Sequence, residues 1–264
     1  MIRVAALTKA FGPVLAVDQA TFEVAKGVIF GIVGPNGAGK STLIRMLTTL
    51  LPPTSGCATV AGYDIVREPG LVRRHIGYVP QLLSADSSLT AMENMLVSAR
   101  LYGIPAHERK QRIDGALAAM GLSEAADHLV SSYSGGMIRR LEIAQSMLHR
   151  PTVLFMDEPT VGLDPSARDA VWQHVLALRS EFQTTMLITS HYMEEVEQLC
   201  DQIALIARGR IVALGTAAEL EARVGPGADL DDVFNKLVGI ESESEAVKSY
   251  AEVRRARRAA RQHG

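Results

Sequence analysis

The chain has 264 residues, of which 47% are hydrophobic, 21% are charged and only 5% are aromatic. Such a length suits one large domain, or a domain with a subdomain, that buries a substantial core. The 27 basic and 29 acidic residues nearly cancel, so no global field marks a nucleic-acid binder. Cys57 and Cys200 lie in no metal-ligand spacing, which argues against a zinc site or a disulfide framework and favours a reducing compartment.

Short apolar runs predict buried strands and no membrane span. A spanning helix needs about 20 mostly apolar residues, whereas residues 28–33, 153–156 and 203–207 form short runs that glycine or charge closes. The first four residues show no apolar core or cleavage site of a signal peptide. We therefore expect a chain that does not cross a bilayer by itself, with these runs as strands of a parallel sheet, apolar on both faces.

The first third of the chain is predicted to alternate strands and turns around one helix. Residues 22–24 and 28–33 read as strands with a turn between them. Apolar residues then recur at helical spacing over residues 41–51, and we expect Pro52 and Pro53 to end this helix, because proline supplies no backbone N–H. Residues 76–79 predict the next strand.

The middle third is predicted to be helical. Thr90 and Glu93 match a capping box at the start of a helix that we expect to stop at Gly103. Further helices are expected around residues 107–120 and 123–130, and another follows Ser134. Residues 88–150 therefore predict helices inserted between strand-forming segments, either as an excursion of an α/β domain or, as we expect, as a helical subdomain within it.

Strands return in the last third, after Pro151. They are expected at residues 153–156, 186–189, 203–206 and 211–214, with a helix over 166–179 and a hairpin turn at Arg208 and Gly209. We expect one domain over residues 1–239 and a charged tail over residues 240–264. The tail begins acidic and ends basic, and a solvated, frayed helix is favoured there over contact with nucleic acid or anionic lipid.

One segment matches the phosphate-binding pattern GxxxxGK[ST] between a predicted strand and a predicted helix. Its residues are Gly34, Pro35, Asn36, Gly37, Ala38, Gly39, Lys40 and Ser41. Glycines let successive backbone N–H groups point at an anion, and the helix dipole adds positive potential. Lys40 is expected to reach the β- and γ-phosphates of a nucleotide, and the Ser41 hydroxyl to bind Mg²⁺.

Two carboxylates follow the predicted strand of residues 153–156. Open α/β sheets place their ligands at the carboxyl ends of strands. Asp157 is therefore expected to hold Mg²⁺, and Glu158 to polarise a water for attack on the γ-phosphate. A third segment, Ser134-Gly135-Gly136, opens a helix and could form a second anion site, although by itself an ordinary capped helix is the favoured interpretation.

In this order, these segments resemble the ATP-binding cassette (ABC) ATPases. The segment from Tyr133 to Met137 resembles the signature motif of that family, and it lies just upstream of Asp157 and Glu158 as it does there. Gln81 matches the glutamine of the Q-loop, Gly162-Leu163-Asp164-Pro165 the D-loop, and His191 the switch histidine. The resemblance covers the chain up to about residue 239. Tyr133 and Met137 depart from the usual residues but lie outside the two glycines.

The resemblance implies an α/β P-loop NTPase fold with a mostly parallel core sheet, an antiparallel β part and the helical subdomain. It also implies ATP and Mg²⁺ as cofactors and a head-to-tail pair of cassettes. Each ATP would lie between residues 34–42 of one chain, Thr42 included, and Ser134, Gly135 and Gly136 of the other. Gln81 would touch Mg²⁺ or the water, and His191 the γ-phosphate. Asp164 would communicate across the pair, and Phe11 would stack on adenine.

Three segments resemble the ATP-binding subunits of ABC-2 type exporters, including the daunorubicin-resistance-like and nodulation-factor-export-like groups. They are residues 133–137, 197–201 and 230–234. The resemblance implies an ATPase that powers export through a separate six-helix membrane permease, from the cytoplasmic face of the inner or plasma membrane. The second ATPase chain is expected to be a copy of this one, with a heterodimer left open, and no specific nucleic acid is expected.

Two other classes of protein share part of this pattern. A non-transport ABC ATPase acting on nucleic acid or the ribosome stays open as the alternative, although neither a long coiled-coil insertion nor a second cassette occurs in the sequence. A GTPase or small-molecule kinase is set aside, because no NKxD segment is present and a kinase has no need of Ser134-Gly135-Gly136.

Overall fold

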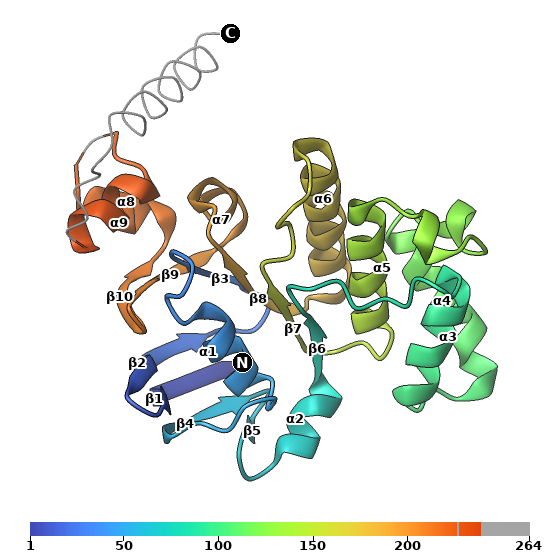
Figure 1. The fold of residues 1–264 in the computed structure, drawn as a ribbon, viewed down its shortest axis with the longest axis horizontal. Helices are drawn as coiled ribbons and strands as arrows, with labels where there is room; N and C mark the ends of the chain where they lie inside the picture. The colour runs from blue at the N-terminus through green and yellow to red at the C-terminus, as the bar shows by residue number, and fades with distance from the viewer. Residues whose placement is uncertain (226, 239–264) are drawn as a thin grey trace, which may run out of the picture.

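The computed structural model describes residues 1–225 and 227–238, which contain two β-sheets and the helices around them (Figure 1). The smaller sheet is antiparallel, in the order β2-β1-β4-β5. Its strands are β1 (Ile2–Phe11), β2 (Val14–Val24), β4 (Ser55–Val60) and β5 (Tyr63–Asp64).

The larger sheet has the order β10-β9-β3-β8-β7-β6, and its neighbours from β9 to β6 are all parallel. Its strands are β3 (Ile29–Val33), β6 (Ile76–Val79), β7 (Val153–Asp157), β8 (Thr185–Ser190), β9 (Gln202–Ala207) and β10 (Arg210–Gly215). Strand β10 runs antiparallel to β9. The predicted turn between them is confirmed: Arg208 and Gly209 both have positive φ, 49° and 80°, as a tight hairpin requires.

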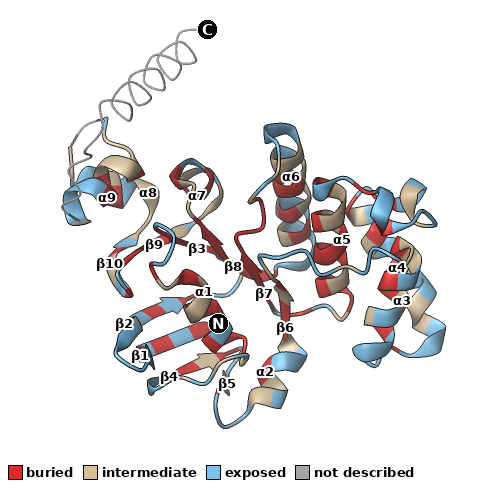
Figure 2. Cartoon of the chain, in the orientation of Figure 1, coloured by how far each residue is buried: buried red, intermediate tan, exposed pale blue. Residues whose placement is uncertain are grey.

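Both faces of the parallel sheet are buried (Figure 2). Successive side chains of each strand point to opposite faces, so each strand contributes to a core on either side. On one face, Phe30 and Phe155 pack toward the antiparallel sheet, with helix α1 (Lys40–Leu47) in the same core. Phe30 stacks on Phe22 of β2 with ring centroids 5.0 Å apart. On the other face, Leu154 and Met156 pack toward the helices of residues Gly135–Met147 (α5) and Pro165–Phe182 (α6).

The segment between β6 and β7 is mainly helical, as predicted. It contains α3 (Ala91–Leu101), α4 (Ala106–Ala119) and α5 (Gly135–Met147), and α6 (Pro165–Phe182) follows β7. The capping box at the start of α3 is confirmed, since Thr90 and Glu93 bond each other's backbone N–H. These helices share one apolar core with the sheet. The boundaries 88–150 for a separate subdomain remain a prediction.

The remaining helices are short. They are α2 (Pro69–His75), α7 (Met193–Leu199), α8 (Ala217–Ala222) and α9 (Leu230–Val238). Val196 of α7 and Val233 of α9 pack in one core with Leu205 of β9. Among the described residues, none of the helices has the length and apolar character that a membrane span needs. The predicted charged tail of residues 240–264 lies outside them.

Two predicted helices are wrong in extent or type. The helix predicted over 41–51 ends at Leu47, because Thr49 adopts a left-handed φ of 63° and Leu50 N–H bonds back to Arg45 O, so Pro52 and Pro53 do not end it. The helix predicted around 123–130 is replaced by two 3₁₀ turns, Ser123–Ala125 and Val130–Ser132. Between them the chain turns at Ala126 and Asp127, and only Leu129 is extended, where it forms a bridge with Thr90 before α3.

Candidate active site

The glycine-rich loop joins β3 to α1 and presses against backbone on two sides. A Cβ at Gly34 would lie 2.1 Å from Ile206 O, and one at Gly39 would lie 2.3 Å from Ala16 O. Gly39 also has φ 105°, a conformation that L-residues with a side chain rarely adopt. The loop therefore requires glycine at both positions, which explains the pattern seen in the sequence.

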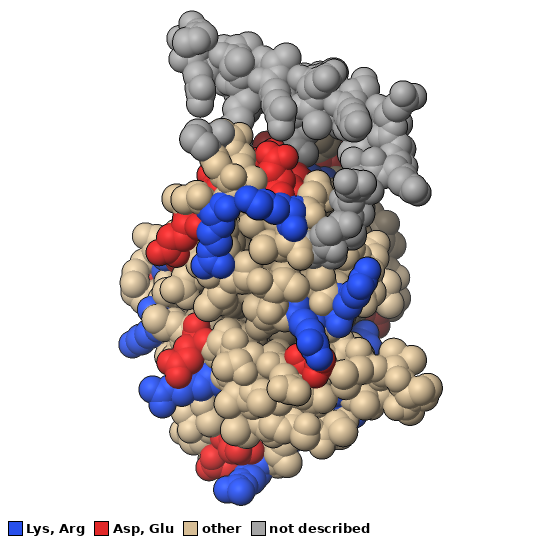
Figure 3. Space-filling model, turned by 90° about the vertical axis from the view of Figure 1, so that its left-hand side faces the viewer, with Lys and Arg blue, Asp and Glu red and all other residues tan. Residues whose placement is uncertain are grey.

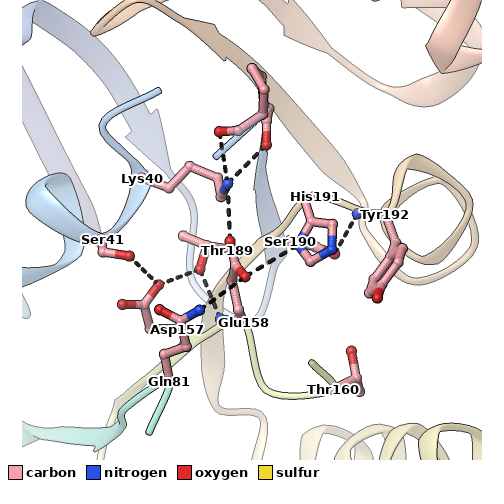
Figure 4. A network of polar contacts seen from close by, with 12 residues as sticks. Lys40, Ser41, Gln81, Asp157, Glu158, Thr160, Thr189, Ser190, His191 and Tyr192 are labelled. Carbon is pink, nitrogen blue, oxygen red and sulfur yellow. Dashed lines mark hydrogen bonds and ion pairs between the residues drawn. The ribbon is translucent and has the colours of Figure 1, made fainter. Parts of the chain in front are cut away.

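Lys40, the first residue of α1, is buried under this loop (Figure 4). Its Nζ donates to Gly34 O at 2.8 Å and to Pro35 O at 3.1 Å. The same ammonium forms an ion pair with Glu158 Oε1 at 3.0 Å, with both side chains about 95% buried. The loop thus aims a positive charge at the helix end where backbone N–H groups are also available to an anion.

Asp157 ends β7 and is held from two other elements. Its Oδ1 accepts a hydrogen bond from Ser41 Oγ at 3.0 Å and one from Thr189 Oγ1 at 2.7 Å. Burial, and after it the charge of Asp157, raises the pKa of Tyr78 on the adjoining strand β6. A carboxylate and a hydroxyl are therefore fixed side by side at the carboxyl edge of the sheet.

Glu158 is the meeting point of the predicted catalytic residues (Figure 4). Its φ of 48° is unusual for a residue with a side chain, and its backbone N–H donates to Thr189 Oγ1 at 2.9 Å. Glu158 Oε2 accepts from Gln81 Nε2 at 3.3 Å and from the ring nitrogen Nδ1 of His191 at 3.2 Å. Since a carboxylate only accepts, Nδ1 carries the hydrogen in this contact.

A second group of predicted residues lies where α5 and α6 begin. Ser134 caps α5 by accepting from Met137 N–H, and Asp164 caps α6 by accepting from Ala167 N–H. Ser134, Gly136 and Asp164 line a cavity of about 270 Å³. The structure thus brings the signature and D-loop residues together, as a group apart from that around Lys40.

Phe11 and the outer residues of the loop are exposed. Phe11, half-exposed at the end of β1, lies with its ring centroid 5.2 Å from Lys9 Nζ. The hairpin it belongs to continues into β2, whose Ala16 touches Gly39. Pro35, Asn36 and Gly37 are exposed, while Ala38 is buried and Thr42 is half-buried on α1.

Some side chains that hold this site were missed in the sequence. Thr189 supports both acidic residues, and buried Glu195 of α7 accepts hydrogen bonds from Thr160 Oγ1 at 3.0 and 2.9 Å and from Ser190 Oγ at 3.3 Å. Thr189 and Ser190 are the last two residues of β8 and directly precede His191. Their position next to the predicted switch histidine was the signal in the sequence that could have identified them. Glu195 gave none, because its role depends on contacts with a distant segment.

A glycine-rich loop between a parallel strand and a helix, a buried lysine at its end, and an acidic pair at the carboxyl edge of the same sheet define a P-loop nucleotide hydrolase. At this edge of the sheet the hydroxyl of Ser41 lies 3.0 Å from the carboxylate of Asp157, and the carboxylate of Glu158 follows in the chain. The predicted roles, Mg²⁺ ligands for the first two and a base for the third, are those that this class uses on its nucleotide.

Comparison with known proteins places the chain within that class. Residues 17–161 match the profile of the ABC transporter family. The daunorubicin/doxorubicin resistance ATP-binding protein DrrA of Streptomyces peucetius is 46% identical over 85% of this chain and 68% of its own length. The Nod factor export ATP-binding protein I of Mesorhizobium japonicum is 40% identical over 86% of this chain and 64% of its own. The chain belongs to the ABC transporter family.

A solved structure agrees with this assignment. The structure of an ATP-binding subunit of an ABC transporter superposes with a TM-score of 0.80 at 28% identity, covering 90% of this chain and 99% of its own. The predicted fold class, the exporter-type resemblance and the prediction of an ATP-binding, ATP-hydrolysing subunit are therefore confirmed. The roles assigned to individual residues stay predictions.

Proposed function

We propose that this chain hydrolyses ATP as one of a pair of cassettes and drives an ABC-2 type exporter through a separate membrane subunit. The convergence of Lys40, Gln81 and His191 on the Glu158 carboxylate is the observation that carries the proposal. ATP would bind with its phosphates on residues 34–42. Phe11 would lie against the adenine.

The residues present fit a magnesium ion. Ser41 Oγ and Asp157 Oδ1 lie 3.0 Å apart, and the Gln81 side chain lies beside Asp157 (Figure 4), so its amide oxygen would be a third hard donor. No group of three His, Cys, Asp or Glu side chains suited to a metal occurs in the described part of the chain. That agrees with Mg²⁺, which proteins hold through one or two ligands together with substrate phosphates. When bound, Mg²⁺ would neutralise charge on the β- and γ-phosphates.

Glu158 is proposed as the base that accepts a proton from the attacking water. Gln81 and His191 hold its Oε2, so the carboxylate keeps one orientation. Lys40 would exchange its ion pair with Glu158 for the phosphates, which would free Oε1 for the water. His191 would then contact the γ-phosphate and position it against Glu158.

The second chain is proposed to complete each site. Ser134 and Gly135 are exposed and Gly136 is buried where α5 begins, and Asp164 lines the same cavity as Ser134 and Gly136. Their backbone N–H groups would face the γ-phosphate held by a second copy, in a head-to-tail homodimer. Asp164 would contact that copy.

The membrane subunit is proposed to dock near the loop after β6, at the cytoplasmic face of the membrane. Leu82 and Leu83 follow Gln81 and are 83% and 49% exposed, and Leu101 of α3 is 83% exposed. Large apolar side chains so exposed are typical of a contact surface. A partner there, six-helix in the ABC-2 type, would sense the state of Gln81.

Co-expression tests this proposal against the alternative of a nucleic-acid-directed or ribosome-directed ABC ATPase. On the face drawn in Figure 3, basic side chains are mixed with acidic ones, which does not favour nucleic acid. We expect the chain to co-purify with the membrane protein encoded beside it, and Leu82→Glu to weaken that association without changing ATP binding. A stable ATPase that binds no membrane protein and is stimulated by DNA would contradict the proposal.

A further inference from the structure

Helix α5 carries a buried ion pair that the proposed mechanism does not use. Arg139 Nη1 lies 2.9 Å from Glu142 Oε2, and both side chains are only 2% exposed. Full burial of two charges is costly, and packed apolar side chains of similar size would serve stability as well or better. The contacts that the pair makes with another segment therefore explain it better than the stability of the helix.

Arg139 binds the backbone carbonyls on both sides of the Gln81 Cα, those of Pro80 and of Gln81 itself. Its Nη1 donates to Pro80 O at 2.6 Å, and its Nη2 donates to Gln81 O at 2.7 Å. A planar guanidinium presents these two N–H groups in a fixed fork, which an ammonium does not. Arg139 Nε is buried with no hydrogen-bond partner, so the two carbonyls and the Glu142 carboxylate together orient the guanidinium.

Glu142 holds the following residues of the same loop. Its Oε1 accepts hydrogen bonds from the backbone N–H and the Oγ of Ser84 and from the backbone N–H of Ala85, the last at 3.3 Å. The ion pair thus binds residues 80–85 at their carbonyls through Arg139 and at their N–H groups through Glu142. Burial lowers the pKa of Arg139, and the charge of Glu142 opposes that shift.

The place of this pair in the chain links two parts of the site. Arg139 lies five residues after Ser134, on the helix that the signature residues open. Gln81, whose carbonyl Arg139 binds, presents its side chain to Glu158 at 3.3 Å. One buried side chain therefore joins the start of α5 to the residue that reaches the candidate base.

We propose that Arg139 and Glu142 are positioning residues that clamp residues 80–85 to α5 and so hold the Gln81 amide beside Glu158 and Asp157. This rests on the proposed role of Gln81 toward Mg²⁺. A pair that only stabilises α5 would leave the loop's own protection and the metal requirement of the folded enzyme unchanged.

Amide hydrogen exchange of the full chain tests the clamp directly, without nucleotide or metal. In Arg139→Gln we expect peptides covering residues 82–86 to exchange about tenfold faster, because the Ser84 and Ala85 N–H groups lose a fixed acceptor. Peptides covering residues 34–42 should not change. Arg112→Gln is the matched control, since Arg112 bonds Glu108 on α4 and Leu148 O, both outside this loop.

The dependence of ATPase activity on Mg²⁺ concentration tests whether the clamp positions Gln81. The Mg²⁺ concentration for half-maximal ATPase should rise about tenfold in Arg139→Gln, as it should in Gln81→Ala, because loss of a supporting contact loosens a metal ligand. Binding of a fluorescent ATP analogue should stay unchanged. Arg139→Lys and Glu142→Gln give the same comparison if Arg139→Gln does not fold, since each retains part of the polar contact.

Three outcomes decide the matter. Unchanged exchange at residues 82–86 in a folded Arg139 or Glu142 variant would overturn the clamp. Faster exchange with an unchanged Mg²⁺ requirement, while Gln81→Ala raises it, would overturn the positioning role. If Gln81→Ala itself leaves the Mg²⁺ requirement unchanged, the proposed role of Gln81 fails, while faster exchange in Arg139→Gln still supports the clamp.

Discussion

Glu158 is expected to promote hydrolysis of the nucleotide and at the same time to weaken its binding. Its carboxylate is proposed to activate water, yet it also pairs with Lys40, the residue expected to bind the phosphates. A phosphate that approaches Lys40 therefore competes with a buried carboxylate and is repelled by it. Chemistry and binding are thus expected to respond in opposite directions when this charge is removed.

Glu158→Gln should lower steady-state ATP hydrolysis by about 10²- to 10⁴-fold, because an amide cannot accept the proton. ATP should bind at least as tightly as it does to the parent chain, because the competitor for Lys40 is gone. Phosphate release and equilibrium binding of a fluorescent ATP analogue measure the two effects. Ordinary turnover in this variant would remove Glu158 from its role, and weaker binding would contradict the competition.

The two cysteines should differ in reactivity. Burial raises the pKa of Cys200, whose Sγ would lie 2.8 Å from a Cβ at Gly31, whereas Cys57 is exposed on β4. Only the thiolate is nucleophilic. We expect one thiol to react with Ellman's reagent in the native chain at pH 8 and two after unfolding. Cys57→Ser should leave no fast-reacting thiol.

The same burial has a consequence for stability. The folded-state pKa of Cys200 lies above its unfolded-state pKa. The buried neutral thiol therefore contributes fully to the free energy of unfolding below the unfolded-state pKa, and this contribution is lost as the pH rises from there toward the folded-state pKa. Cys200→Ala should therefore flatten the decline in the free energy of unfolding above about pH 8.5, the ordinary cysteine pKa. An identical decline in the parent and the variant would contradict this account.

At the scale of elements, α5 and α6 are close enough at their first turns to require a glycine. A Cβ at Gly136 would lie 2.9 Å from the Cβ of Ala167. Gly136→Ala should lower the free energy of unfolding by about 1–3 kcal/mol through overpacking. Chemical denaturation measures it.

Two variants check that the cause is this contact. Gly115, in the middle of α4, has open space where a Cβ would lie, so Gly115→Ala should gain up to about 1 kcal/mol. Adding Ala167→Gly to Gly136→Ala should recover part of the loss. If the double variant is no more stable than Gly136→Ala, the close approach of the helices is not the cause.

Whether a strand or helix could be predicted from the sequence depended on how it is buried and paired in the fold. The strands of the parallel sheet were found because they are buried on both faces, which leaves continuous apolar runs. Strand β1 was missed, since half of it is exposed and its pairing with β2 shifts register between Val4 and Ala10. The predicted end of α1 was wrong, because the left-handed residue that ends the helix is Thr49. In most helices this residue is a glycine, which a sequence pattern reveals.

The residues of the site also divide into those that a local sequence pattern predicts and those that depend on contacts between distant segments. Lys40, Asp157 and Glu158 could be predicted because each belongs to a local pattern whose chemistry depends on spacing along the chain. Arg139 and Glu195 could not, since the segments they bind, at Gln81 and Thr160, are 58 and 35 residues away along the chain. A helix pattern does not distinguish a buried charge that binds a distant loop from one on a solvated face.

At the scale of the whole molecule, one chain is proposed to hold two halves of different ATP sites. The group around Lys40 and the group around Ser134 form separate clusters, although both are proposed to contact ATP. Two copies placed head to tail would bring each Lys40 group against the other copy's Ser134 group. ATP would then lie in the interface and stabilise the closed pair, because it binds that state with more contacts.

Glu158→Gln should therefore be a monomer without nucleotide and a dimer with ATP, since ATP is bound but not consumed. Light scattering after size exclusion should show the mass doubling only when ATP is present. Lys40→Ala in the same background should remain monomeric because it lacks the phosphate contact, and Ser134→Glu should remain monomeric although it still binds ATP, because a carboxylate at the start of α5 repels the γ-phosphate. An ATP-bound dimer of the Ser134→Glu double variant would rule out the head-to-tail arrangement.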